Sequence, residues 1–394
     1  MISFDYLIIG GGPVGLSAAI AIKQRGFSVA VVDKHSLDVE PINPGRAYAI
    51  NQLSQHLLTS LNVWSRLPKE KLSPYEKMFV WDPKGQAEIS FDCRERGTST
   101  LGFIVEEHLL KQALYEEYAI NPLPPLEAET LIEHDDHIIL KAYDDQGNEH
   151  LLRAGMVFIT DGASSSLRQT LKVPLTHWPY HHHATVATIR TEKSHQKTAY
   201  QIFTHEGPLA FLPLADPHLC SIVWSASPAF AKHLSTLSID AFNEALAATF
   251  EQKLGACQLV SSRRQFPLHM RHVEQYHGKR WILMGDAAHT IHPLAGLGLN
   301  LGLADLNTWL ELTEKASLSP SILGAYQRKR KSETWAAIGL MELLKVTFTQ
   351  STGPLPWLRG LGMNVINKIT PLKRLMMDYA CGTIPHTKSG TTPP

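Results

Sequence analysis

The sequence has little of what marks several large classes of protein. Only 4 of its 394 residues are cysteine, at positions 93, 220, 257 and 381, and they form neither a CxxC pair nor the spacing of metal ligands. This argues against a disulfide framework and a zinc site, and it fits a reducing cytosol. We expect no metal from the 20 histidines either, because the sequence lacks HExxH and similar ligand patterns.

Net charge is also missing. Lys plus Arg and Asp plus Glu number 37 each, so no overall positive field would attract nucleic acid. The one long uncharged run, 7–22, is interrupted by Gly10, Gly11, Gly12 and Pro13, and the six residues before it contain no Lys or Arg. We therefore predict neither a signal peptide nor a membrane span, and we expect a cytoplasmic protein.

The first 33 residues have the pattern of a strand, a helix and a second strand. Residues 5–9 are apolar, 13–25 have helical periodicity, and 28–32 are rich in β-branched residues. A crossover of this length starts a parallel sheet covered by helices. Residues 156–160 and 281–284, each apolar and each followed by an Asp-containing turn, are predicted to be further strands of that sheet.

The middle of the chain has a different pattern. Residues 183–226 hold short β-rich segments separated by turns, which predicts an antiparallel sheet, and the pattern becomes helical from Gly298 to about residue 380. The predicted fold class is α/β, with a doubly wound domain, an inserted antiparallel sheet domain and C-terminal helices. The predicted boundaries are 1–70, 95–175 and 280–340 for the first domain, 71–94 and 176–279 for the second, and 341–394 for a helical region with a disordered tail.

The strongest motif is the glycine-rich turn at 10–15, with the sequence GGGPVG. Gly10 permits a tight turn, Gly12 lets a pyrophosphate approach the backbone, and Gly15 lets the helix pack on the strand. Asp33 ends the next strand, where a carboxylate can accept hydrogen bonds from a ribose. This context favours a dinucleotide site over a turn that only serves packing.

Two further motifs follow predicted strands. Asp161 and Gly162 begin a turn whose sequence, taken alone, favours an ordinary strand-to-helix connection with a Ser N-cap over a ligand site. Asp286 lies in GDAAH, and a glycine-rich loop leads from there to a helix that starts near Gly298. The amides at such a helix start stabilise negative charge, as on a reduced flavin.

In this order the three motifs resemble the group A flavoprotein monooxygenases, which are similar to para-hydroxybenzoate hydroxylase, and within them the aromatic hydroxylases of ubiquinone biosynthesis. Family-like stretches occur at 45–64, 101–114, 207–214, 222–225 and 359–382, so the resemblance covers nearly the whole chain. It implies an FAD-dependent enzyme that uses O2 and NAD(P)H, through a flavin C4a-hydroperoxide, to hydroxylate a polyprenylated phenol or quinol. NAD(P)H would dock transiently, because no second GxGxxG unit is present.

The resemblance also implies roles for individual residues. The implied cofactor-binding residues are Gly10, Gly12, Gly15, Asp33, Arg46, Asp161, Gly162, Asp286, Pro293, Gly296, Gly298, Leu299 and Asn300. Pro293, Leu297 and Gly298 are assigned to the catalytic loop at the flavin. Phe211, Pro213 and Trp224 are candidate walls of the substrate pocket, although an aromatic side chain on a sheet more often belongs to the core. Asp33, Glu107, Thr160 and Leu297 depart from the usual family residues.

Two other functions stay open at this stage. A hydroxylase of a small soluble phenol or aromatic acid would need Arg or His side chains aimed at a carboxylate. A flavin-binding scaffold of a biosynthetic complex is suggested by Glu107 and Leu297. Residues 341–380 combine apolar and basic residues with few acidic ones, which predicts either packing on the FAD domain or a peripheral contact with an anionic membrane or a partner complex.

Overall fold

The parallel sheet predicted at the N-terminus is present in the computed structural model, which describes residues 1–37, 46–83, 88–118, 123–291, 297–314 and 319–349. Its strand order is β2-β1-β10-β9-β8, and β17 pairs with β10. The pairs β1–β2, β1–β10 and β10–β17 are parallel, as expected, whereas β8 and β9 form an antiparallel extension. The strands are β1 Ile2–Ile9, β2 Val29–Val32, β8 Glu127–Glu133, β9 Ile138–Tyr143, β10 Glu149–Ile159 and β17 Trp281–Leu283.

A second sheet of nine strands contains the segments predicted as the antiparallel sheet. Its order is β18-β16-β11-β14-β13-β12-β5-β6, with β15 paired to β11, and its pairs are antiparallel except for β12 with β5. The strands are β5 Lys77–Trp81, β6 Glu88–Asp92, β11 Leu175–Thr191, β12 Thr198–Phe203, β13 Pro208–Pro213, β14 Leu219–Ala226, β15 Cys257–Leu259, β16 Arg264–Val273 and β18 His289–Thr290.

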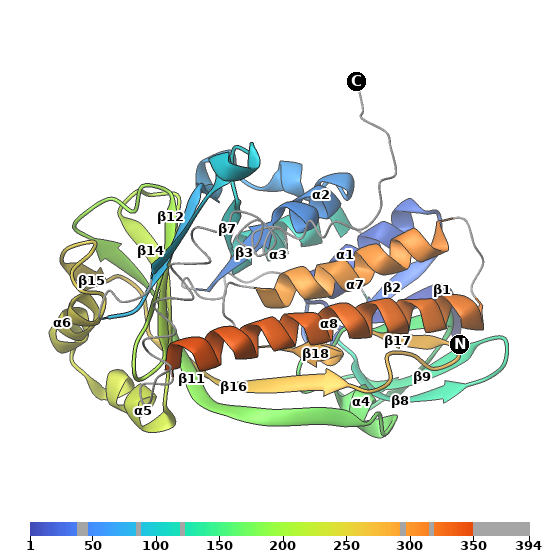
Figure 1. Ribbon diagram of the computed structural model, residues 1–394. Coiled ribbons are helices and arrows are strands. Elements are labelled where there is room, and N and C mark those ends of the chain that lie inside the picture. Colours follow the sequence, from blue (N-terminus) through green and yellow to red (C-terminus); the bar gives the residue numbers. More distant parts are fainter. Residues whose placement is uncertain (38–45, 84–87, 119–122, 292–296, 315–318, 350–394) are drawn as a thin grey trace.

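A small antiparallel sheet of β3 Ala47–Asn51, β7 Gly102–Glu106 and β4 Ser73–Tyr75 lies between these two. The described helices are α1 Pro13–Gln24, α2 Gln52–Ser60, α3 Glu107–Tyr118, α4 Ser166–Thr170, α5 Pro228–Thr236, α6 Ile239–Thr249, α7 Leu297–Thr313 and α8 Pro320–Thr349. In Figure 1, α8 runs along the molecule from the region of β1 and β17 on the right to the labelled part of β11 on the left. Within the described residues, no helix is both long enough and apolar enough to cross a membrane.

The main hydrophobic core lies around the parallel sheet. Helix α1 is buried from Gly15 to Ile22 because it contacts β1, β2, α3 and α7 at once. On α7, Leu303 and Leu306 are buried, and Leu299 and Leu310 pack on the same core, so this helix has one apolar face. The helical prediction for 350–380 lies outside the described residues.

A separate core covers the outer face of the large sheet. Phe211 stacks on Phe250 with ring centroids 3.6 Å apart, and Trp224 contacts Phe230 and Phe242. These three partners come from α5, α6 and the end of α6, so the helices at the left of Figure 1 cover this face. The opposite face of the same strands is therefore the one available for a ligand.

The cysteines in the described part of the chain are buried free thiols. They are Cys93, Cys220 and Cys257. Burial raises the pKa of each thiol, to about 11 for Cys257. None of the three lies at the cavity described below.

Candidate functional site

One cavity connects the glycine-rich turn with the inner face of the large sheet. Its volume is about 600 Å³. One wall is formed by strand β3, by the starts of α1, α3 and α7, and by the turns after β10 and β17. The other wall is formed by β11 to β14, β16 and Met78 of β5. The cavity thus joins the glycine-rich, Asp-Gly and GDAAH motifs.

A Cβ atom added at Gly10, Gly12 or Gly15 of the first motif would meet different surroundings. Gly10 has φ +106°, and a Cβ there would lie 2.5 Å from the Thr160 carbonyl oxygen. A Cβ at Gly15 would lie 2.0 Å from the Gly10 carbonyl oxygen, so Gly15 permits the close approach of helix to strand. A Cβ at Gly12 would have no protein atom within 4 Å and would project at the cavity.

The start of α1 faces this same space. Pro13 occupies the first helical turn, Gly12 is the N-cap, and neither a side-chain cap nor an acidic residue satisfies the first amides. An uncapped helix start with a glycine cradle is suited to an anionic diphosphate. These residues fit the diphosphate of a flavin dinucleotide.

Asp33 holds the glycine turn in place. Its Oδ2 accepts a 2.6 Å hydrogen bond from the Gly11 N–H, and its Oδ1 accepts one of 2.9 Å from the His35 N–H. A carboxylate oxygen has more than one lone pair, so these bonds leave acceptor capacity for a ribose hydroxyl.

Arg46 lies at the cavity in a cluster with Tyr48, Glu107 and Lys111. Glu107 Oε1 accepts a 2.8 Å hydrogen bond from the Tyr48 hydroxyl, and lies 3.7 Å from Arg46 Nη1 and 3.4 Å from Lys111 Nζ. Burial opposes ionisation of Glu107, but Arg46, Tyr48 and Lys111 outweigh it and keep its pKa below the usual value. The carboxylate of Asp286 also interacts with Arg46, so two carboxylates and two cations lie at this end of the cavity.

The Asp161-Gly162 turn is both a capped helix start and part of the cavity. Ser165 Oγ accepts a 3.1 Å hydrogen bond from the Arg168 N–H, as predicted for an N-cap, while Gly162 and Ala163 line the cavity. The Oδ1 of Asp161 is buried without a hydrogen-bond partner in the described structure, and burial raises the pKa of this carboxyl. An unpaired buried acceptor of this kind fits a bound donor group.

Arg168 was not predicted as a site residue, yet it joins two motifs. Its guanidinium donates 2.8 Å hydrogen bonds to the carbonyl oxygens of Ala163 and Ala287, and the residue is 4% exposed. It thereby fixes the Asp-Gly turn against the GDAAH turn. An arginine one turn into a helix looks like a surface residue in sequence, so only the buried carbonyl groups reveal this role.

Asp286 reaches the cavity, and a buried ionic cluster lies behind its turn. Asp286 is exposed at the cavity surface, but the protein around it partly desolvates the carboxyl and raises its pKa, with partial compensation from His289 and Arg46. Asp305, fully buried on α7, accepts hydrogen bonds from the Gly285 N–H (2.8 Å), His289 Nε2 (2.8 Å) and Arg330 Nε (2.6 Å). This cluster holds the backbone of the turn that presents Asp286.

His272 packs beside this cluster and gives a testable pH dependence. Burial, together with the charges of His289 and Lys331, lowers its pKa to about 4. In an unfolded chain the pKa of histidine is about 6.5. Between about pH 4 and pH 6.5 the unfolded chain therefore binds a proton at His272 that the folded chain excludes.

We therefore expect stability to fall as the pH is lowered from about 6.5 to about 4, by up to about 1.4 kcal/mol per pH unit from this residue. His272→Gln should remove that part of the slope. Denaturant unfolding at several pH values measures it, and equal slopes in wild type and variant would contradict the assignment.

The start of α7 is partly as predicted. The helix begins at Leu297, and Gly298 and Leu299 line the cavity. Asn300 is 5% exposed, and its amide bonds to the Asn51 N–H (3.0 Å) and the Ala49 carbonyl oxygen (2.7 Å), so its side chain ties α7 to β3. Pro293, Gly296 and the Leu297 side chain lie outside the described residues.

The three candidate substrate residues do not line the cavity. Phe211 and Trp224 are 0% and 1% exposed in the outer core, and Pro213 lies on the same side of β13 as Phe211. Successive side chains of a strand point to opposite faces, so the cavity is lined by the neighbours Ala210, Leu212, Val223 and Ser225. The prediction of Phe211, Pro213 and Trp224 as wall residues is therefore wrong by one position along each strand.

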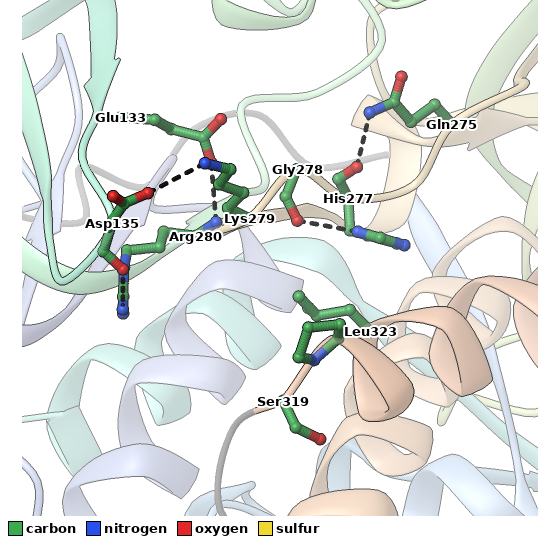
Figure 2. A pocket seen from close by; sticks show the side chains of 10 residues that line it. Glu133, Asp135, Gln275, His277, Gly278, Lys279, Arg280, Ser319 and Leu323 are labelled. Carbon is green, nitrogen blue, oxygen red and sulfur yellow. Dashed lines mark hydrogen bonds and ion pairs between the residues drawn. The ribbon is translucent and has the colours of Figure 1, made fainter.

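A second pocket of about 690 Å³ lies at the far end of the parallel sheet (Figure 2). It brings together none of the predicted site residues, and its polar groups satisfy one another. Lys279 Nζ lies 3.0 Å from Asp135, the Arg280 N–H donates to Glu133, and Gln275 donates to the His277 carbonyl oxygen. We therefore place the functional site in the cavity that joins the three motifs.

Comparison with known proteins agrees with this site. The model of the FAD binding domain family matches residues 3–340. Among solved structures, p-nitrophenol 4-monooxygenase PnpA from Pseudomonas putida DLL-E4 superposes with a TM-score of 0.78 at 17% identity, covering 98% of this chain and 100% of that one. OxyS anhydrotetracycline hydroxylase from Streptomyces rimosus superposes with a TM-score of 0.73 at 19% identity, covering 100% of this chain and 78% of that one. These two similarities establish the fold.

Two curated relatives are similar over almost their full length. Ubiquinone hydroxylase UbiL of Rhodospirillum rubrum is 30% identical over 404 residues, covering 99% of this chain and 91% of that protein. The 3-demethoxyubiquinol 3-hydroxylase of Escherichia coli is 32% identical over 393 residues, covering 96% of this chain and 98% of that protein. The chain therefore belongs to the FAD binding domain family and, within it, to the family of the Escherichia coli 3-demethoxyubiquinol 3-hydroxylase.

Proposed function

We propose that this protein is an FAD-dependent monooxygenase that uses NAD(P)H and O2 to hydroxylate the ring of a neutral, polyprenylated phenol or quinol in ubiquinone biosynthesis. The observation that carries this proposal is the distribution of charge in the cavity. The two curated relatives described above are named for ubiquinol or ubiquinone hydroxylation, which supports the same reaction class.

The charged groups of the cavity all come from the dinucleotide side. Among the described lining residues they are Arg46, Glu107, Lys111 and Asp286, whereas the large sheet contributes only uncharged side chains. A carboxylate bound against that sheet would lose its hydration without gaining a cation, which is unfavourable. The sheet therefore favours a neutral apolar substrate over an aromatic acid.

Bound FAD supplies the redox chemistry that activates oxygen and inserts one oxygen atom into the ring. The start of α1, with Gly12, would hold the diphosphate, and Asp33 would bind the adenosine ribose. Arg46, Asp161, Gly162 and Asp286 would contact the remaining polar groups of FAD. The α7 start, with Gly298, Leu299 and the backbone of Asn300, would stabilise negative charge on the flavin.

The same proposal includes the discontinuous domain division and the catalytic loop of Pro293, Leu297 and Gly298. The division is supported by β5 and β6, which join the large sheet although they precede β7 in sequence. The apolar sheet would exclude water from the reacting ring.

A peripheral membrane or complex contact through 341–380 also belongs to the proposal, because a polyprenylated substrate lies in a lipid phase.

The experiment is a substrate comparison with purified, flavin-loaded protein. We expect a short-tailed demethoxyubiquinol to stimulate NAD(P)H oxidation and to gain one oxygen atom by mass spectrometry, and 4-hydroxybenzoate to do neither. Preferential hydroxylation of the acid would favour the soluble-acid alternative. A colourless protein that binds no added FAD would instead favour the scaffold alternative.

A further inference from the structure

The cavity face of the large sheet is a floor of small and apolar side chains. Ala184 and Ser225 are paired across β11 and β14, and Val223 faces Ala210 across β14 and β13. All four line the cavity. Adjacent strands lie about 4.8 Å apart, so these short side chains leave room for a flat ring to lie against the sheet.

Among the polar side chains that the large sheet contributes to the cavity, Gln201 and Ser225 lie on this floor, and Tyr200 and Thr290 also line the cavity. Gln201 on β12 is half-buried and paired with Ala210, and Ser225 on β14 is 2% exposed. Both line the cavity. Both side chains therefore present hydrogen-bonding groups to the cavity.

The Ser225 hydroxyl has no side-chain hydrogen bond in the part of the chain that the structure describes. Its neighbours Trp224 and Ala226 point into the outer core, so strand alternation directs Ser225 into the cavity. A hydroxyl that lines a cavity and makes no bond to protein can donate to, and accept from, a bound ligand. A ligand that brings an oxygen or hydroxyl to this point would satisfy it.

We propose that Ser225 is a substrate-binding residue that hydrogen-bonds an oxygen substituent of the ring and so fixes the ring's orientation on the floor. This inference rests on the proposed function, since it assumes a ring with oxygen substituents. The polyprenyl tail would then lie along the apolar part of the cavity toward Phe266 and Pro267, which line it and are solvent-exposed.

The test compares wild type with Ser225→Ala and Ser225→Thr, all flavin-loaded. The matched control is Ser221→Ala, which makes the same change on the same strand at a buried serine outside the cavity. The probe is an oxidised, short-tailed demethoxyubiquinone, and binding is followed by the change in flavin absorbance. We expect Ser225→Ala to raise Kd about three- to tenfold, the range for one neutral hydrogen bond, and Ser225→Thr to restore it.

A series of probes, each lacking one ring oxygen substituent, separates a hydrogen bond from a general loss of packing. Wild type and Ser225→Ala should bind one probe of the series with equal affinity, namely the probe that lacks the oxygen substituent to which Ser225 hydrogen-bonds. In turnover with the corresponding quinol, Ser225→Ala should also convert a smaller fraction of oxidised NAD(P)H into hydroxylated product.

The outcomes distinguish the two levels of the proposal. If wild type binds and hydroxylates the quinol but Ser225→Ala matches Ser221→Ala with every probe, the role of Ser225 is refuted and the proposed function stands. If wild type binds no quinone and hydroxylates no quinol, the proposed function itself fails.

Discussion

Gly12→Val should give a folded protein that does not retain FAD. The backbone at Gly12 has φ −73° and ψ 175°, which any residue adopts, and a Cβ there meets no protein atom within 4 Å. The valine methyl groups would instead occupy the space in front of the α1 amides that the diphosphate needs. We expect at least about a hundredfold weaker binding, or about 3 kcal/mol, measured by flavin absorbance after purification and by titration with FAD.

The control is Gly339→Val on α8, which also adds a side chain where no atom lies within 4 Å, at an exposed position that does not line the cavity. It should be yellow, with wild-type affinity for FAD. Circular dichroism and thermal unfolding of the two apoproteins verify that Gly12→Val is folded. Normal FAD content in Gly12→Val would show that the diphosphate does not bind at this turn.

Asp305→Ala should strongly destabilise the protein, by about 3–5 kcal/mol, the usual cost of leaving a buried charge without its partner. Arg330, whose side chain is 0% exposed, would lose the carboxylate that accepts its Nε–H and keep only the partly exposed Glu333 as an ionic partner. The Gly285 N–H and His289 would lose the same acceptor. Chemical denaturation measures the change, and weaker FAD binding should accompany it because the Asp286 turn is no longer held.

Two further variants identify the cause. Asp305→Leu combined with Arg330→Met removes both charges and should recover much of the loss, while Glu311→Ala, at an exposed ion pair on the same helix, should change stability little. Equal stability of the single and double variants would assign the loss to the Gly285 and His289 bonds instead.

The pH dependence of this effect has a defined sign. Burial alone would raise the pKa of Asp305, but His289 and Arg330 outweigh it, so the folded pKa lies below the ordinary value. The stabilisation is therefore complete above about pH 4, where an unfolded Asp is ionised, and is lost as the pH falls through the folded pKa. The difference between wild type and Asp305→Ala should shrink in that acidic range.

The dinucleotide half of the site was predictable because its constraints are local. A turn such as 10–15 needs glycine wherever backbone approaches backbone, and Gly10 and Gly15 meet that need in the structure. The strands β1 and β2 and helix α1 also appear within a few residues of their predicted bounds. Periodicity and turn chemistry determine such elements without reference to distant parts of the chain.

The substrate half was not predictable to the same degree. Both faces of β13 and β14 carry apolar residues, so alternation does not reveal which face meets the ligand. That choice depends on Phe230, Phe242 and Phe250, which cover the Phe211 and Trp224 side from later in the sequence. Asp305 and Arg330 were missed for a related reason, since charged residues on helices usually face solvent and only the packing of α7 against α8 buries this pair.

The buried thiols have a consequence for a protein that handles oxygen. Oxygen-using flavoenzymes can release hydrogen peroxide near their own side chains, and cysteine is oxidised by peroxide through its thiolate form. Burial raises the pKa of Cys93, Cys220 and Cys257, so at neutral pH these thiols are almost entirely protonated as well as inaccessible. In this part of the chain, the fold itself protects cysteine from the by-product of an unproductive reaction cycle.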